Sequence, residues 1–508
     1  MFFPYIWVMI TIVYSTRSTN PTFQEEIKKT IGVKKYQVLE YVNDGEYSLT
    51  ELYNKGLKEA ENDIVVFCHD DIYFNKKNWG RKLLNNFTNN PDFGIIGIAG
   101  STQMGEDGCW WTDRRKMVGI VNHAHEGKKW TNRYSANFQD KIIETVLVDG
   151  LFFAVDRTKV NQDFNESFDG FHFYDVDFSF NNHLNDVKVG VCFNVRVTHR
   201  SIGMTNQEWD TNRLKFTVVY RDSLPMSLTP EIIYNTKDIR IKKQPKLGIV
   251  IPTKDNLDLL FKCLDSIYDK TQYENFKIYV ADTGSTPENK EKINEYVGKK
   301  DNLILVEYNY YNFGKINNDV VNNHVDGNTE LLLFCNNDIE LLNDAISRVV
   351  QTHQKHKSKI GTVGARLHFE DNTVQHNGIF MMLNKENQLQ FGHLDIYNTY
   401  FYNIMEKEVA GNTGAFLLIS KVLFDKIGGY NEAYIECLED VELNLECVML
   451  NRVNIIDSNA VCYHYEGKTR NENGMKDNFL ETDMRERLIP FINEKYMKLN
   501  KVFLTPQQ

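Results

Sequence analysis

Phe67-Cys68-His69-Asp70-Asp71-Ile72 recurs 267 positions later as Phe334-Cys335-Asn336-Asn337-Asp338-Ile339, with four of the six residues identical. Each stretch follows an apolar run, Ile64 to Val66 in the first case and Leu331 to Leu333 in the second, that is typical of a buried parallel strand. A repeat at a large, fixed offset indicates that a structural unit is duplicated.

The acids and histidines downstream keep nearly the same offset. Asp175 corresponds to Asp440 and His199 to His464, each pair 265 positions apart, and in both halves the histidine follows the acid by 24 residues. Polar residues of unrelated domains have no reason to stay in register over so long a stretch. The sequence therefore predicts two unequal copies of one fold, arranged head to tail.

The length of 508 residues exceeds what one hydrophobic core supports and suits two domains. Pro225, Pro230 and Pro245 bracket a polar stretch that is typical of a linker. We therefore predict a divergent first domain, a linker, a second domain and a helical tail at residues 1–225, 226–245, 246–475 and 476–508.

Strand and helix signals alternate along the second half, which predicts an α/β fold with a doubly wound, Rossmann-like mixed sheet. In such a sheet the ligand binds beyond the carboxyl ends of the strands. The expected strands are 247–251, 277–281, 303–308 and 330–335, and the expected helices are 257–268, 287–297, 315–323 and 441–449.

The composition, with 42% hydrophobic and 25% charged residues, is that of a globular protein. A net charge of −11 argues against nucleic acid as a partner, since that needs clustered Lys and Arg. The eight cysteines form no CxxC pair and no dense framework, which favours a reducing compartment and leads us to expect a cytoplasmic protein.

The apolar opening from Met1 to Tyr14 has no basic residue ahead of it and contains Pro4. It is shorter than the roughly 20 residues that a membrane-spanning helix needs. We expect a buried first strand at Met9 to Tyr14, so that any contact with a membrane is peripheral.

Acidic side chains close two of the expected strands of the second half. Asp282 and Asp338 would face the ligand crevice, where carboxylates accept hydrogen bonds from a nucleoside or bind Mg²⁺ or Mn²⁺. His464 adds an imidazole ligand, and Asp440 at the start of a helix is placed to act as a general base. An Asp at a strand end or helix start is more often a cap or a turn former, but the joint recurrence favours a functional interpretation.

With these residues in this order, the second half resembles the family 2 glycosyltransferases, which have the nucleotide-binding GT-A fold. Ile251-Pro252-Thr253-Lys254-Asp255 is similar to the opening strand motif, and Ala281-Asp282-Thr283-Gly284-Ser285 to the nucleotide-binding acid with its turn. Asn336-Asn337-Asp338 stands where the family has its metal-binding DxD triplet. Other segments continue the match in order: 311–318, 361–365, 371–376, 409–416 and 438–443.

The resemblance implies that the second half binds a nucleotide diphosphate sugar and transfers the sugar with inversion. A divalent metal, Mn²⁺ or Mg²⁺, would be held by Asp338 and His464, and Asp440 would be the base. Asn336 replaces the usual Asp, so the metal site has one charge fewer. The implied donor-binding residues are Thr253, Asp255, Asp282, Asn312, Asn336 and Asn337, with Lys468 and Arg470 as further diphosphate contacts.

The first half resembles a more divergent branch of the same family. By this resemblance Asp175 is its base, Asp71 and His199 are its metal ligands, and Asp70 contacts the donor. Its front end is about 29 residues shorter, which is one strand–helix unit. No counterpart of Asp-Thr-Gly-Ser is evident, and Thr16 and Asp44, after the first and second strands, are the substitutes that we expect.

Two smaller observations bear on the first half. Leu39-Glu40-Tyr41 falls on Val306-Glu307-Tyr308 at the offset of 267. Trp110 and Trp111 are open to two interpretations, a platform for a sugar ring or part of the core, because an indole offers both a flat apolar face and bulk.

Three functions compete. The first is a bifunctional transferase that takes nucleotide diphosphate sugars and extends a glycan or a lipid-linked glycan, such as a bacterial capsule or lipopolysaccharide, at the inner face of the cytoplasmic membrane. The second is a single active second half, with the first half as a glycan-binding module. The third, a nucleotidyltransferase, is disfavoured because neither half opens with a Gly-rich, Lys-containing phosphate loop.

Overall fold

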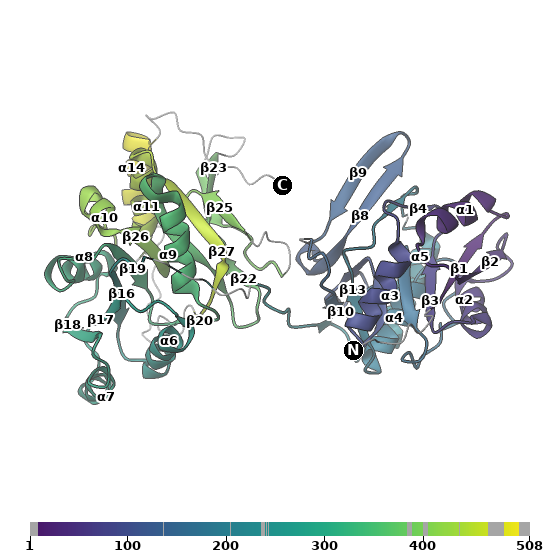
Figure 1. Cartoon of the computed structure of the whole chain (residues 1–508), viewed down its shortest axis with the longest axis horizontal. Helices are drawn as coiled ribbons and strands as arrows, with labels where there is room; N and C mark the ends of the chain where they lie inside the picture. Colours follow the sequence, from purple (N-terminus) through teal and green to yellow (C-terminus); the bar gives the residue numbers. More distant parts are fainter. Residues whose placement is uncertain are drawn as a thin grey trace. The chain divides into compact units, whose positions relative to one another are not determined.

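The structure is a computed structural model of the chain. The described residues are 9–135, 137–203, 205–234, 239, 241, 243–383, 389–399, 405–435, 437–465 and 482–496. They form two compact units that meet in sequence at Pro230 and Glu231, inside the predicted linker, and each unit is described by itself (Figure 1).

The main sheet of the first unit has seven strands in the order β10-β13-β5-β12-β3-β1-β2, which begins with β10 (Ile143–Thr145) and β13 (Lys188–Val191). Strand β1 (Ile10–Thr16) lies next to the edge strand β2 (Tyr36–Val42) and pairs in parallel with β2 and with β3 (Ile64–Cys68). Strand β12 (Phe152–Asp156) runs antiparallel between β3 and β5 (Phe93–Gly97). The residues of β1 and β3 are nearly all buried, as their continuous apolar sequences predict.

A smaller sheet holds the residues that follow β3. Its order is β11-β6-β8-β14-β4, and these strands are β11 (Leu147–Val148), β6 (Ala99–Ser101), β8 (Met117–His125), β14 (Val197–His199) and β4 (Ile72–Phe74). Strand β9 (Lys128–Arg133) pairs with β8, and Figure 1 shows the two as a long hairpin. The helices of this unit are α1 (Pro21–Thr30), α2 (Leu49–Glu59), α3 (Trp79–Asn89), α4 (Tyr174–Leu184) and α5 (Gln207–Val219).

The second unit is built on a ten-stranded sheet. Eight strands follow the path β18-β17-β16-β19-β26-β21-β27-β20, while β22 (Val374–His376) pairs with β21 and β25 (Glu406–Val409) pairs with β27. Its parallel part joins β16 (Leu247–Thr253), β17 (Phe276–Asp282), β18 (Leu303–Glu307) and β19 (Leu331–Cys335). The remaining strands of the path are β26 (Phe416–Ser420), β21 (Ile360–His368), β27 (Val453–His464) and β20 (Ile339–Leu341).

Both faces of this sheet are covered, because side chains alternate along each strand. One apolar cluster joins Ile249 and Ile251 to α6 (Leu257–Lys270) and α9 (Ala345–His356). The other joins the intervening Val250 to three helices, α8 (Phe313–Asn323), α10 (Lys421–Ile427) and α11 (Glu439–Met449). The doubly wound fold predicted from the sequence is confirmed.

The predicted strands and helices of the second half are also confirmed, with shifts of one or two residues at their ends. The helix predicted at 287–297 is α7 (Pro287–Val297), where Thr286 accepts a hydrogen bond from the amide of Asn289 and Pro287 occupies the first turn. Of the predicted tail, 482–496 is described and helical, with Ile489–Phe491 as α14. No helix in the described parts of the chain is both long and apolar enough to cross a membrane.

The strand order corrects one correspondence drawn from the repeat. The offset of 267 matches β2 with β18, but β2 lies beside β1, where the second unit has β17 beside β16. The amide of Asn43 donates to the carbonyl of Thr16 at 2.8 Å, just as Thr283 donates to Thr253 at 2.8 Å. The short sequence match gave the wrong counterpart for β2, because the neighbours of a strand are set by its pairing in space and no local sequence pattern records that pairing.

Candidate active sites in the two units

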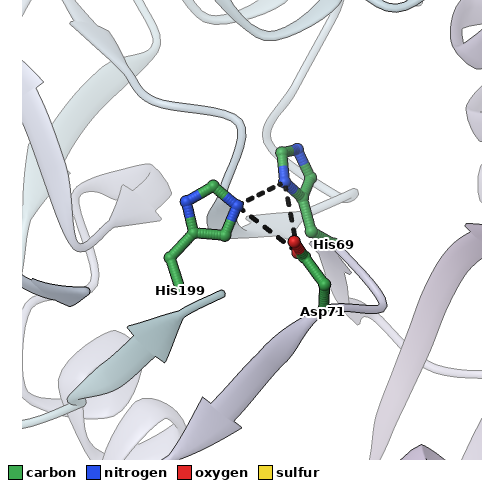
Figure 2. Close-up of side chains that lie close together, drawn as sticks. All are labelled: His69, Asp71 and His199. Carbon is green, nitrogen blue, oxygen red and sulfur yellow. Dashed lines mark hydrogen bonds and ion pairs between the residues drawn. The ribbon is translucent and has the colours of Figure 1, made fainter. Parts of the chain in front are cut away.

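Asp71 follows β3, and the antiparallel pairing of β14 with β4 brings His199 next to it. The pairing sets His199 opposite Ile72 and leaves 3.3 Å between Asp71 Oδ1 and His199 Nε2 (Figure 2). His69 joins them, with its Nδ1 atom 3.4 Å from His199 Nε2 and 3.9 Å from Asp71 Oδ1. The three side chains each offer one ligand atom, and these atoms lie within 4.8 Å of one another.

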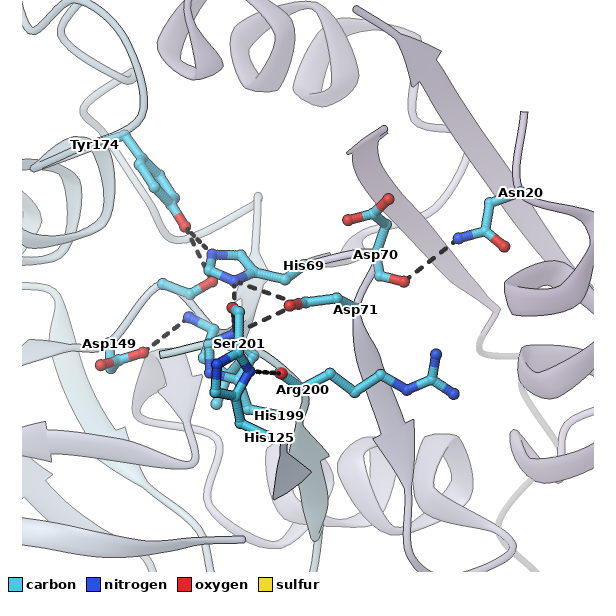
Figure 3. A network of polar contacts seen from close by, with 12 residues as sticks. Asn20, His69, Asp70, Asp71, His125, Asp149, Tyr174, His199, Arg200 and Ser201 are labelled. Atoms are coloured by element: carbon cyan, nitrogen blue, oxygen red, sulfur yellow. Dashed lines mark hydrogen bonds and ion pairs between the residues drawn. The ribbon is translucent and has the colours of Figure 1, made fainter. Parts of the chain in front are cut away.

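Burial and neighbouring side chains shift the pKa values of Asp71 and His69. Burial alone would raise the pKa of Asp71, but the hydrogen bond and charge of His199, with His69 and Ser201, outweigh burial and lower the pKa to about 2. Burial and the neighbouring His199 lower the pKa of His69. The hydroxyl of Tyr174 lies 3.1 Å from His69 Nε2 and that of Ser201 lies 2.9 Å from His199 Nε2 (Figure 3).

Asp175 is the second residue of α4 and directly follows Tyr174. Its carboxylate accepts a hydrogen bond of 2.5 Å from the amide of Gly150, in the loop before β12. Phe173, which precedes the helix, has a left-handed φ of 66°, a strained conformation for a bulky side chain. Burial and then the Asp149 carboxylate raise the pKa of Asp175 to about 7, which suits a general base.

A cavity of about 1310 Å³ contains this cluster. Thr16, at the end of β1, and Asp70 line it together with Asp71, Asp175 and His199. Asp44 is exposed and is not among the lining residues. Its buried neighbour Asn43 lines the cavity instead, but the Asn43 side chain is occupied by the amides of Glu46 and Tyr47 and the carbonyl of Tyr47.

The second unit repeats the acid–histidine pair. Strand β27 sets His464 opposite Ile339 of β20, and Asp338 Oδ1 lies 3.3 Å from His464 Nε2. The Nδ1 atom of His464 lies 2.7 Å from the side-chain oxygen of Gln375. A proton on Nδ1 satisfies that contact, so the Nε2 lone pair faces Asp338.

Asn336 takes the place of His69 in this unit. Its amide nitrogen is 3.3 Å from His464 Nε2, and the next residue, Asn337, donates to the Thr253 hydroxyl at 3.0 Å. Thr253 in turn lies opposite Asp282 in the pairing of β16 with β17. The predicted donor-binding and metal-binding residues Thr253, Asp282, Asn336, Asn337, Asp338 and His464 therefore gather at the carboxyl ends of adjacent strands.

Two other residues predicted to bind the sugar donor, Asp255 and Asn312, make hydrogen bonds that connect parts of the fold. Asp255 accepts hydrogen bonds from the amide of Thr286 and the side chain of Asn289, which tie it to the start of α7. Asn312 caps α8 through the amide of Lys315 and donates to the carbonyls of Glu432 and Tyr434. Lys468 and Arg470 lie outside the described residues.

Asp440 occupies the second residue of α11, as Asp175 does in α4. Its carboxylate accepts a hydrogen bond of 2.7 Å from the amide of Gly414, two residues before β26, as Gly150 stands two residues before β12. Leu438 precedes the helix with a left-handed φ of 73°. Burial raises the pKa of Asp440.

Both acid–histidine pairs fit a divalent cation. Asp71 Oδ1 and Asp338 Oδ1 are buried, and each lies 3.3 Å from the Nε2 atom of a histidine. A carboxylate oxygen and a neutral imidazole nitrogen both present lone pairs, so a cation between them relieves their repulsion. Neutral imidazole and carboxylate are ligands that Mn²⁺ accepts.

The sequence did not point to several residues of these sites. His69 was visible as a histidine inside the repeated triplet, and its chemistry was signal enough to add it to the ligands. Nothing local marked Ser201 or Asp149, and Gln375 stood in the matching segment 371–376 with no role assigned to it, since these residues reach the sites only through the packing of distant strands. Gly150 was hidden and Gly414 stood in the matching segment 409–416 with no role assigned to it, although their positions differ by 264 residues.

Comparison with known proteins gives one family for both units. Residues 24–220 match the model described as a glycosyltransferase-like family, and residues 248–428 match glycosyl transferase family 2. The uncharacterized protein y4gI of Sinorhizobium fredii is 29% identical over 234 residues, 44% of this chain and 25% of that protein. The O-antigen biosynthesis protein RfbC of Myxococcus xanthus is 28% identical over 242 residues, 45% of this chain and 18% of that protein.

The chain thus spans a quarter or less of the length of these two relatives. Among solved structures, the mannosyltransferase PcManGT of Pyrobaculum calidifontis, in complex with GDP-Man and Mn²⁺, aligns with 50% of this chain and 64% of its own. That alignment has a TM-score of 0.33 and 14% identity. Each unit matches a glycosyltransferase family model, and the chain belongs to the family 2 glycosyltransferases, with two such domains in tandem.

Proposed function

We propose that the chain is a bifunctional glycosyltransferase in which each half transfers one sugar from a nucleotide diphosphate sugar to a glycan. The observation that carries this proposal is the recurrence of one arrangement in both units. In each, a strand-end acid faces a histidine at 3.3 Å, and a second acid at the start of a helix is held by a glycine amide. A module that only binds glycan has no need for a paired base and cation site.

Transfer would proceed by one inverting displacement. A bound Mn²⁺ or Mg²⁺ would neutralise the charge that develops on the departing nucleoside diphosphate. His69, Asp71 and His199 would hold it in the first half, and Asp338 and His464 in the second. Asp175 or Asp440 takes the proton of the acceptor hydroxyl as its oxygen bonds to the anomeric carbon and the bond to the diphosphate breaks.

The donor would lie at the carboxyl ends of the first strands. In the second half Thr253 and Asp282, buried side by side at the ends of β16 and β17, suit the hydrogen-bonding groups of a nucleoside. In the first half Val42 stands opposite Thr16 where the second half has Asp282. The two halves therefore present different chemistry to the nucleotide, which favours two different donors.

We place the enzyme in bacterial surface polysaccharide synthesis, on a glycan or lipid-linked glycan acceptor at the inner face of the cytoplasmic membrane. The similarity to an O-antigen biosynthesis protein supports the pathway. Eight free cysteines support a reducing compartment.

Donor turnover with Mn²⁺ across a panel of nucleotide sugars tests the proposal. Asp175→Asn and Asp440→Asn are compared with wild type and with Asp92→Asn and Asp258→Asn, two exposed carboxylates as matched controls. We expect each active-site substitution to abolish turnover of a different donor. If Asp175→Asn changes nothing while Asp440→Asn removes all activity, the first half is a binding module and the proposal is wrong.

A further inference from the structure

The cavity of the first unit carries aromatic side chains that the transfer chemistry does not use. Trp111 is 40% exposed and Phe171 is 48% exposed, and both line the cavity together with Trp209. The ring centroids of Trp111 and Trp209 are 5.4 Å apart. Trp110 also borders the cavity but is buried in an apolar cluster, so of the two neighbours only Trp111 offers an exposed ring face.

Helix α5 organises the two exposed rings, Trp111 and Phe171, and the half-buried Trp209. Trp209 lies on this helix, and its neighbour Glu208 accepts a hydrogen bond from the amide of Phe171. Arg213, one turn further on, donates to the carbonyl of Asp107, in the loop that carries Trp111. Rings held in this way present a surface that loses little conformational entropy when a ligand binds.

The aromatic group stands next to the base. Trp209 packs against Phe173, with ring centroids 5.8 Å apart, and Asp175 follows Phe173 by two residues. The segment from Ser15 to Thr22, where the first domain would take its nucleotide, lines another part of the same cavity. The rings and the Asp175 carboxylate therefore line one cavity, on a part of its wall distinct from the segment Ser15 to Thr22.

We propose that Trp111, Phe171 and Trp209 form the acceptor subsite of the first domain and stack on a pyranose ring of the acceptor glycan. A pyranose has an apolar face of C–H groups and a polar rim, which matches flat indole and phenyl faces open to a polar cavity. This assignment rests on the proposed function, because it takes the first half to transfer sugar.

The test measures binding and transfer separately. Saturation-transfer NMR with methyl α- and β-pyranosides and the matching disaccharides, in Mn²⁺ and without donor, reports direct binding to the full-length chain. We expect Trp111→Ala and Phe171→Ala each to weaken glycoside binding about tenfold, the loss that corresponds to roughly 1.4 kcal/mol. Trp111→Phe should keep most of the glycoside affinity, since phenylalanine also presents a flat aromatic face.

Tyr47→Ala is the matched control, because Tyr47 is an exposed aromatic residue of the same unit that does not line the cavity. Transfer by the first half is then followed in an Asp440→Asn background. Trp111→Ala should raise the KM for the acceptor about tenfold and change that for the donor less than twofold.

Several outcomes would overturn the subsite. These are glycoside binding that is the same in Trp111→Ala as in wild type, no binding of any glycoside by wild type, or a raised KM for the donor in place of the acceptor. If wild type binds glycosides through these rings but Asp175→Asn changes no donor's turnover, the proposed function of the first half fails and the binding site remains.

Discussion

Asp71 Oδ1 lies 3.3 Å from His199 Nε2, and Asp338 and His464 keep the same separation in the other unit. The cause is one antiparallel pairing in each unit, of the strand after the acid with the strand that ends in the histidine. The units differ at one position of this arrangement, His69 in the first and Asn336 in the second.

That difference predicts unequal metal affinities. An imidazole is a stronger ligand for Mn²⁺ than a neutral amide, so the first site should bind more tightly. We expect Asn336→His to tighten binding at the second site about tenfold and His69→Asn to weaken the first by a similar factor. Isothermal titration of Mn²⁺ into each variant gives both constants. Equal affinities for wild type and His69→Asn would show that His69 is not a ligand.

Gln375 should act as a positioning residue for the second metal site. Its side-chain oxygen lies 2.7 Å from His464 Nδ1, which holds the imidazole with Nε2 toward Asp338. Removal of such a partner typically costs about 10 to 100-fold in metal affinity. Gln375→Ala should therefore weaken Mn²⁺ binding in the second unit, while Gln375→Glu, which keeps the acceptor, retains it. The same titration measures both, and unchanged binding in Gln375→Ala would refute the role.

The first half should lose activity as the pH falls through about 7, because burial and Asp149 raise the pKa of Asp175 to about 7 and a base acts only when deprotonated. Tyr53 and Tyr174 also interact with this carboxylate, but their own pKa values are raised well above 10, so they stay neutral. Asp149→Asn removes a negative charge and should move the acid limb to lower pH.

This pH dependence is measured as kcat/KM for transfer by the first half in an Asp440→Asn background. An acid limb that stays in place in Asp149→Asn would show that the Asp149 charge does not act on the base. Asp92→Asn, which changes an exposed carboxylate of the same unit, is the control for a general effect of charge.

Asp175→Asn should stabilise the first unit while it inactivates it. The folded-state pKa of Asp175 is raised from 3.8 to about 7, so its contribution to stability is present at low pH and is lost as the pH rises through 7. Asparagine never ionises, so the variant does not lose this folding stability, which amounts to about 1.4 kcal/mol for each unit of pKa shift. Thermal unfolding should show a higher Tm for the variant at pH 8, and the difference should narrow toward pH 4. A variant less stable than wild type at pH 8 would contradict this.

Much of the architecture was accessible from sequence because it depends on local patterns. The apolar runs at 247–251 and 331–335 and the periodic stretch at 257–268 appear as β16, β19 and α6. The spacing of the acids and histidines predicted the repeat, and the residues that it singled out, Asp71 with His199 and Asp338 with His464, do meet.

Sequence by itself thus determined that the chain holds two copies of one fold, and which acid and histidine of each copy belong together, since both follow from hydrophobic pattern and spacing within a domain. Only the tertiary structure decided that β2 stands in the place of β17, that His69 joins its cluster, and that Trp111 is exposed while Trp110 is buried. These outcomes depend on strand pairing and packing between segments far apart in the chain, and no local stretch of residues carries that information.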